Sequence, residues 1–262
     1  MANEIYNDPL CVVAYGGGTD STGMLCGMVE GKFAPPHAIL FADTGGEKPG
    51  TYTLVATVSD YLVANGYPPV TVVRRSRRDG KWESLEDNCL RLNMLPSVAY
   101  GYKTCSQKYK IEPQDKWCNN DAVCKSTWKS GAKVVKLIGY GYGEVHRARF
   151  YEDRKYVWTY PLIDWKWRRE DCIAAIHRAG LPYPIKSACF FCPHTRKDEI
   201  LSLGMTYPDL LGRALTMESK AKLTTIKGLG RRFSWADFIR QPDSDALVDV
   251  DELPCGCFDG DR

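Results

Sequence analysis

The chain has 262 residues, of which 44% are hydrophobic and 26% charged, and its formal net charge is +3. These values are typical of a globular protein with a substantial core, and the length fits one large α/β domain with an appended C-terminal region. The small net charge restricts any nucleic-acid-binding surface to a local patch. No apolar run reaches about 18 residues and the first residues are polar, so we expect no membrane span, no secretory signal and a cytoplasmic location.

The eleven cysteines are many for a chain of this length, and their number is odd. In a cytoplasmic protein, such a density favours metal, cluster or thiol chemistry over a framework of disulfides. Cys11 and Cys26 stand among apolar residues, so we interpret them as small buried hydrophobic side chains.

A strand, a glycine turn and a helix start follow one another near the beginning of the sequence. The apolar run 10–15 has the length and valine content of a buried parallel strand. The residues that follow it are Gly16, Gly17, Gly18, Thr19, Asp20, Ser21 and Thr22. Glycines let backbone N–H groups approach an anion, while hydroxyls and a helix N-terminus face its negative charge. The order predicts a phosphate site, and a glycine turn without a ligand is the alternative.

The second predicted strand, 37–42, runs directly into Asp43, Thr44 and Gly45. In open α/β sheets, functional groups collect at the carboxyl ends of strands. These three residues could hold a ribose or an adenine edge, or help to hold a metal ion that carries the phosphates. The same residue types are also common in an ordinary capped turn.

The remaining pattern completes an alternation of helices and strands. It predicts helices at 51–65, 82–95, 168–179 and 208–223, strands at 70–74, 133–138 and 156–162, and a short helix capped by Ser234 with Trp235 and Phe238 inward. The polar stretch 114–133 contains Cys118 and Cys124, for which we predict no site. The polar residues after Gln241 suggest a mobile arm.

Charged residues follow two of these strands. Four arginines lie within 74–78, where they could grip the phosphates of a nucleotide or nucleic acid, or form a solvated loop. Glu144 and Arg147 come soon after the strand at 133–138 and could serve a triphosphate or an adenylated intermediate. An ordinary ion pair between residues three apart would explain them equally well.

Cys189 and Cys192 form a Cys-x-x-Cys pair, which presents two thiolates to one metal site or one redox event. Pro193 and the aromatic residues between the cysteines favour an iron–sulfur cluster over a structural zinc ion, since no second such pair occurs at zinc-finger spacing. Cys105 stands near two lysines.

Taken in order, these motifs resemble the phosphoadenylyl-sulfate reductase superfamily of PP-loop ATP pyrophosphatases, in particular its iron–sulfur members. Residues 16–21 are similar to the family's SGGxDS loop, with Gly16 in place of the usual serine. Residues 43–49 resemble its DTG-x-E-x-P signature, and 139–147 its G-x-x-x-x-E-x-x-R signature. The resemblance implies a doubly wound, mostly parallel α/β sheet of the adenine nucleotide α-hydrolase (HUP) type. We expect that domain over 1–200, and a helical region with a cysteine-bearing tail over 201–262.

The resemblance also implies the components of the site. ATP and Mg²⁺ would bind at 16–22 and 43–45, with Asp20, Glu144 and Arg147 in catalysis. The family's cluster-bearing members have a cysteine pair before a basic segment, but here Thr104 precedes Cys105. The cluster ligands that carry over are therefore Cys105, Cys189 and Cys192, which implies a [4Fe–4S] cluster with three cysteine ligands. Cys255 and Cys257 are candidates for a fourth ligand or for a catalytic nucleophile.

This set of groups implies an enzyme that adenylates a base or phosphate of tRNA or DNA, releases pyrophosphate and inserts sulfur. A donor such as a cysteine desulfurase would supply the sulfur, and a homodimer is a further expectation. Two alternatives stay open. One is reduction of an adenylyl sulfate to sulfite through a C-terminal cysteine, and the other is a nucleotide-binding module whose cysteines hold structural zinc.

Overall fold

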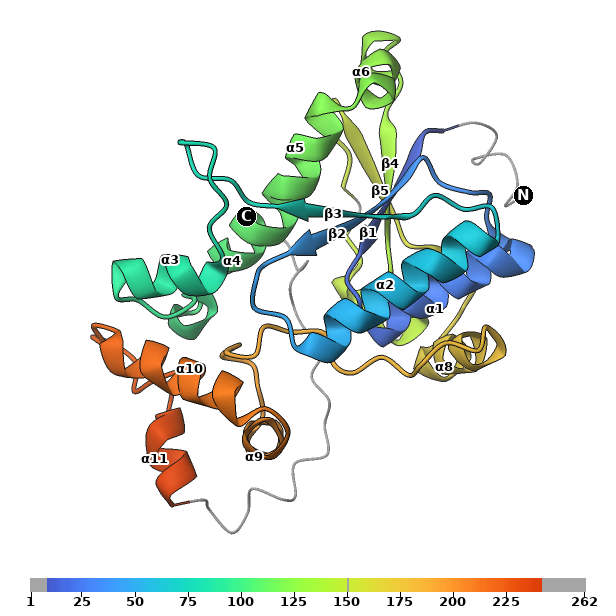
Figure 1. Ribbon diagram of the computed structural model, residues 1–262. Coiled ribbons are helices and arrows are strands. Elements are labelled where there is room, and N and C mark those ends of the chain that lie inside the picture. The colour runs from blue at the N-terminus through green and yellow to red at the C-terminus, as the bar shows by residue number, and fades with distance from the viewer. Residues whose placement is uncertain (1–8, 150, 242–262) are drawn as a thin grey trace. The chain divides into compact units, whose positions relative to one another are not determined.

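The computed structural model describes residues 9–149 and 151–241, and these form two compact units (Figure 1). The first, which we call the sheet unit, contains the described residues of 1–42, 49–73 and 113–187. The second, which we call the cysteine unit, contains those of 43–48, 74–112 and 188–262. The expected boundary near residue 200 stays a prediction.

A five-stranded sheet forms the centre of the sheet unit, in the order β3-β2-β1-β4-β5. The strands are β1 (Cys11–Tyr15), β2 (Ala38–Asp43), β3 (Val70–Arg74), β4 (Val134–Ile138) and β5 (Tyr156–Thr159). β1 pairs in parallel with both β2 and β4, and β4 with β5. The predicted α/β class with a parallel sheet is therefore confirmed. Tyr15 pairs with Phe41, so β1 and β2 reach the same edge of the sheet together.

Helices cover both faces of this sheet (Figure 1). The helices on the first face are α1 (Thr19–Gly27), α2 (Pro49–Ala64) and α8 (Arg169–Arg178). They bury one set of alternate β1 side chains, including Val13 and Tyr15. On the second face, α5 (Glu112–Asn120) and α6 (Ala122–Lys129) pack against the other set, including Val12. Because side chains of a strand alternate between faces, one apolar strand supplies two cores.

The helices α5 and α6 lie in the stretch that the sequence pattern left without structure. Their few buried positions include Cys118 and Cys124, which are both fully buried. Most of the other side chains are polar, so the apolar period is weak. The side chain of Asp121 caps α6 by accepting a hydrogen bond from the backbone N–H of Cys124. A helix of this kind depends on packing and capping more than on its own periodicity.

The cysteine unit is mainly helical. Its longer helices are α3 (Leu85–Leu92), α9 (Lys197–Thr206), α10 (Pro208–Lys220) and α11 (Trp235–Arg240), and its short turns are η2 (Ser97–Tyr100), α4 (Thr104–Ser106) and η3 (Gln107–Ile111). Ser234 caps α11, and Trp235 and Phe238 are buried, as predicted. The sequence pattern missed α9. Among the described residues, no helix combines the length and the apolar character that crossing a membrane requires.

Replacing Gly23 with alanine tests the packing of α1 against α8. A Cβ at Gly23 would lie 2.4 Å from the Cβ of Cys172 and 2.6 Å from its Cα. Alanine normally stabilises a helix interior relative to glycine by about 1 kcal/mol. Here we expect Gly23→Ala to lower the free energy of unfolding by about 1–3 kcal/mol, because the two helices must separate.

The measurement is urea unfolding, with Gly212→Ala in α10 as the matched control. A Cβ at Gly212 would meet nothing within 4 Å, so the control should be neutral or stabilising. Equal stability of Gly23→Ala and the wild type would contradict the close packing described here.

Candidate functional site

The predicted phosphate loop joins the end of β1 to the start of α1 in the sheet unit. Gly17 has a φ of +70°, in the left-handed region that favours glycine. A Cβ at Gly17 would also lie 3.2 Å from the side chains of both Phe41 and Thr51. No side chain caps the N-terminus of α1 in the described chain. The backbone amides of that helix start therefore have the arrangement of an anion site.

The hydroxyl groups of this loop point partly into the protein. Ser21 donates a hydrogen bond to the carbonyl of Gly18 at 3.2 Å. The hydroxyl of Thr22, which is fully buried, lies 3.1 Å from that of Tyr15. Thr19 is buried as well, whereas Asp20 is half-buried. An anion at this loop would consequently be bound mainly by backbone N–H groups rather than by the hydroxyls that the sequence suggested.

Two residues that sequence reasoning did not select support the loop. The hydroxyl of Ser187 donates a 2.6 Å hydrogen bond to the carbonyl of Gly16. Gly139, directly after β4, packs so closely that a Cβ there would lie 2.8 Å from the Cα of Ser21. Gly139 is the first residue of the G-x-x-x-x-E-x-x-R signature, although it was not selected for the loop, and Ser187 stands just before the Cys-x-x-Cys pair.

Glu144 and Arg147 form an ion pair with each other inside η4 (Tyr142–Arg147). The guanidinium carbon of Arg147 lies 4.4 Å from the ring centroid of Tyr140, which in turn stacks on Tyr160 at 5.6 Å with an interplanar angle of 12°. The structure thus contains the ordinary ion pair that was the simpler explanation. It also adds a cation–π stack that the sequence did not indicate.

In the cysteine unit, the three predicted cluster ligands line one cavity of about 270 Å³. Cys105 comes from α4, while Cys189 and Cys192 lie on the turn before α9. Thr44 and His194 line the same cavity. Residues far apart in the sequence therefore converge on one place. His194 was not predicted as a site residue, although it follows Cys192 by only two positions.

The Cys-x-x-Cys turn is anchored to the segment after β2. The backbone N–H of Phe190 donates a 2.7 Å hydrogen bond to the carbonyl of Gly46, and both Phe190 and Phe191 are buried. A Cβ at Gly46 would lie 2.8 Å from the ring of Phe191 and 3.3 Å from the Cβ of Cys189. A side chain at position 46 would therefore displace the turn.

The residues Asp43, Thr44 and Gly45 make contacts inside the cysteine unit. The hydroxyl of Thr44 lies 3.2 Å from the sulfur of Cys189. The carboxylate of Asp43 accepts hydrogen bonds from the Gly45 N–H and from Arg74, each at 2.8 Å. These contacts hold the Cys-x-x-Cys turn and the end of β3. Their predicted role with a nucleotide or a metal ion stays a prediction.

Burial raises the pKa of the Cys189 thiol well above its usual value, and the charge of Glu47 adds to this effect. Lys110 and the hydrogen bond with Thr44 oppose it. A thiol in this environment is protonated at neutral pH, but coordination to a metal removes the proton outright. Cys189 is thus poorly suited to be a free nucleophile, and a metal bound here would have to displace its proton. Lys103, Lys110 and Arg231 also line the cavity and would offset the charge of bound thiolates.

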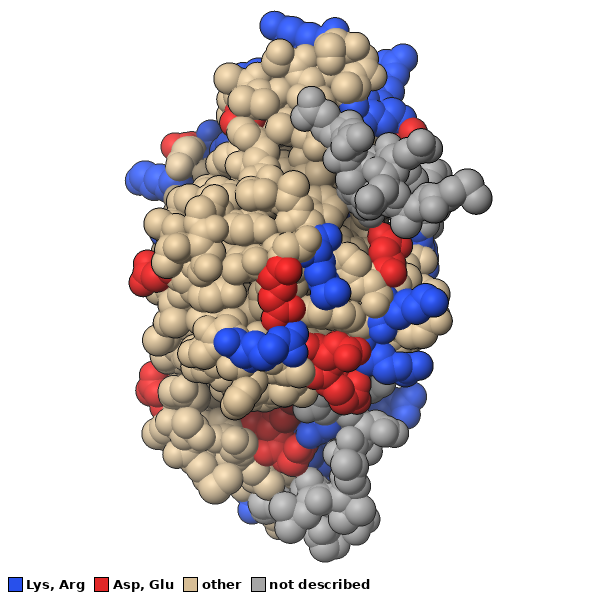
Figure 2. Space-filling view, turned by 90° about the vertical axis from the view of Figure 1, so that its right-hand side faces the viewer, with Lys and Arg blue, Asp and Glu red and all other residues tan. Residues whose placement is uncertain are grey.

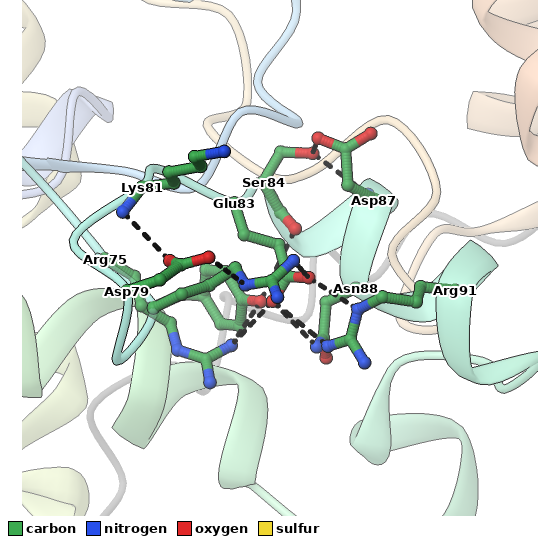
Figure 3. Close-up of polar contacts among 10 residues, drawn as sticks. Arg75, Asp79, Lys81, Glu83, Ser84, Asp87, Asn88 and Arg91 are labelled. Carbon is green, nitrogen blue, oxygen red and sulfur yellow. Dashed lines mark hydrogen bonds and ion pairs between the residues drawn. The ribbon is translucent and has the colours of Figure 1, made fainter.

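The arginines of 74–78 are largely engaged with carboxylates of their own unit. Arg75 and Arg77 lie 3.7 and 3.8 Å from Glu83, whose side chain is only 5% exposed. Arg91 donates a 2.7 Å hydrogen bond to the same carboxylate, and Asn88 donates another at 3.0 Å (Figure 3). Elsewhere on the surface, Figure 2 shows basic and acidic side chains interspersed. A nucleic-acid contact by these arginines would have to compete with their internal pairs.

Cys255 and Cys257, the predicted nucleophile or fourth ligand, lie outside the described residues.

Replacing Glu83 with glutamine tests the arginine cluster. The hydrogen bond from Arg91 lowers the pKa of Glu83, which burial opposes. A lowered folded-state pKa contributes stability above the unfolded-state pKa, and this contribution is lost as the pH falls through the folded value. We expect Glu83→Gln to lose about 1–3 kcal/mol at neutral pH, and the loss to shrink at about pH 3.

Urea unfolding at the two pH values measures the effect. The control is Asp237→Asn, which breaks an ion pair with Arg240 whose two side chains are 72% and 74% exposed, so it should change little. A loss for Glu83→Gln that does not depend on pH would contradict the charged cluster.

Among solved structures, the chain is similar to phosphoadenylyl-sulfate (PAPS) reductase from Candida auris, crystallised as a phosphate complex. The similarity covers 69% of this chain and 78% of that chain, with 19% sequence identity and a TM-score of 0.45. No family model and no curated protein matches the chain. A similarity of this degree says nothing about activity. The α/β architecture is established by the strand pairings themselves.

Proposed function

We propose that this protein is an ATP-dependent enzyme of the PP-loop type that adenylates a base or phosphate of tRNA or DNA, releases pyrophosphate and inserts sulfur. In this proposal Cys105, Cys189 and Cys192 hold an iron–sulfur cluster. The observation that carries the proposal is the convergence of these three cysteines on one cavity, in a chain that also has a glycine turn between β1 and α1.

The cavity fits a cluster in three respects. Its cysteines come from two separate segments that line the same cavity, as the cysteine ligands of an iron–sulfur cluster do. Its lining includes Lys103, Lys110 and Arg231, which balance negative charge. Gly46 leaves room for the Cys-x-x-Cys turn where a side chain would fill the space. When bound, a cluster with one iron free of cysteine supplies a site for sulfur.

The residues of the sheet unit would handle the nucleotide. The amides at the start of α1 bind phosphate oxygens, and the glycines allow the close approach. Asp20, in the first turn of α1, would share a Mg²⁺ ion with the phosphates. Adenylation turns a poor leaving group of the acceptor into a good one, so that sulfur can replace it with release of AMP. Cys189 acts as a ligand in this scheme, and binding of the metal would displace its proton.

Loss of iron from cysteine variants tests the ligand assignment. We expect anaerobically purified Cys189→Ser and Cys105→Ser to lose most of their iron and acid-labile sulfide, since a cluster with two cysteine ligands is poorly held. The control is Cys26→Ser, a buried cysteine of α1 that lies outside the cavity. Iron content in the cavity variants equal to that of the control would rule out these ligands.

Alanine substitutions at two glycines of the sheet unit test whether the loop binds nucleotide. Gly139→Ala places a methyl group 2.8 Å from the backbone of Ser21, whereas a Cβ at Gly143 would meet nothing within 4 Å. We expect Gly139→Ala to weaken ATP binding at least about tenfold by displacing the start of α1, with Gly143→Ala unchanged. Isothermal titration calorimetry gives the affinities, and equal values would remove the loop from the nucleotide site.

Product analysis distinguishes the reaction from its alternatives. Pyrophosphate release from ATP that tRNA or DNA stimulates supports the proposal. Sulfite release from an adenylyl sulfate would instead identify a reductase. Stoichiometric zinc without iron in anaerobic preparations would identify a module with a structural metal.

A further inference from the structure

A second group of metal-binding side chains lies in the sheet unit, away from the phosphate loop. His37 directly precedes β2, while Asp121 and Cys124 belong to the start of α6. Their ligand atoms all lie within 4.8 Å of one another. Among the described residues, no other three His, Cys, Asp or Glu side chains come this close together. The Nε2 of His37 lies 3.0 Å from the carboxylate of Asp121. Because β1 and β2 are parallel, this group sits at the edge opposite the glycine turn.

Cys118 supplies a fourth donor from the neighbouring helix α5. Cys118 and Cys124 are both fully buried. Their thiols hydrogen-bond to each other. The ammonium of Lys136, whose side chain is 7% exposed, lies near Cys118 and pairs with Asp115. Two adjacent thiols on neighbouring helices are donors that one metal ion can share.

A further polar atom lies at the same place. The hydroxyl oxygen of Tyr156 is buried, lies beside Cys118 and meets no partner in good hydrogen-bond geometry among the described residues. A buried polar group without a well-placed partner costs about 1–3 kcal/mol. A metal-bound thiolate at Cys118 would give this hydroxyl a strong acceptor.

We propose that this group is a structural zinc site, in which His37, Asp121 and Cys124 supply three ligands whose atoms already lie within 4.8 Å of one another. Cys118, whose sulfur lies farther than that from at least one of them, turns towards the ion from its contact with Cys124 and completes the four. Two thiolates, an imidazole and a carboxylate are donors that zinc accepts in a closed tetrahedral shell, whereas Mg²⁺ and Ca²⁺ prefer oxygen alone. Binding releases the two thiol protons, and the imidazole contact with Asp121 gives way to coordination by both groups. The ion joins the start of β2 to the α5–α6 corner. This inference does not depend on the proposed enzymatic function.

Access from solvent is available on the side of the two polar ligands. The side chains of His37 and Asp121 are 25% and 19% exposed, whereas both thiols are buried. A zinc ion can therefore enter past the imidazole and carboxylate and finish against the sulfurs. Once the ion is bound, the thiolates are shielded from oxidants.

The test uses the full chain with Cys189→Ser and Cys192→Ser as the background, so that the cavity of the cysteine unit cannot contribute. The protein is made metal-free with a chelator and titrated with Zn²⁺ alone, and bound zinc is measured after gel filtration. We expect the background protein, which carries Cys189→Ser and Cys192→Ser, to bind one zinc ion per chain. The control, in which Cys172→Ser is added to this background, should bind zinc equally well. Adding Cys124→Ser or His37→Gln should weaken zinc binding at least about tenfold.

Co²⁺ substitution gives a readout that does not depend on stability, because cobalt bound by thiolates shows sulfur-to-metal charge-transfer absorption. We expect this absorption in the background protein and also when His37→Gln is added to it. The absorption should be lost in the double serine variant, in which Cys118→Ser and Cys124→Ser are both added. Absence of zinc binding in the background overturns the proposal. So does equal binding by the double serine variant, or a Cys118–Cys124 disulfide in the freshly purified protein. Failure of the enzymatic proposal would leave all these results unchanged.

Discussion

The contact on which the cysteine unit depends is the approach of the Cys-x-x-Cys turn to Gly46. The hydrogen bond from Phe190 to the Gly46 carbonyl fixes the turn, and the missing side chain at that position lets Phe191 and Cys189 reach the backbone. The hydroxyl of Thr44 then meets the Cys189 sulfur. The segment that follows β2 thus serves as a support for the cysteines, whatever else it binds.

Much of the architecture could be predicted from the sequence because its signals are local. Parallel strands buried on both faces are continuous apolar runs, and the predicted strands at 10–15, 37–42 and 70–74 match β1, β2 and β3 within one residue. Ser234 as a cap follows from the same kind of local chemistry. The convergence of Cys105 with Cys189 and Cys192 was anticipated through the family resemblance, since spacing alone gave no reason to join them.

The features that the sequence did not reveal depend on partners distant in the chain. The arginines of 74–78 looked available for phosphates, but the structure places Glu83 and Asp43 beside them. Cys118 and Cys124 had no recognisable spacing, and His37 looked like part of a strand. Only the parallel pairing of β1 and β2 with the packing of α5 and α6 brings that histidine to Asp121.

The hydrogen bond between Tyr15 and Thr22 links the last residue of β1 to the first turns of α1 across the glycines. Both hydroxyls are buried, so the loop is held in shape before any ligand arrives. The loop therefore loses its conformational entropy when the protein folds, and not when a ligand binds. In the proposed nucleotide site, this preformed loop would leave selectivity among phosphate-bearing ligands to the groups around it.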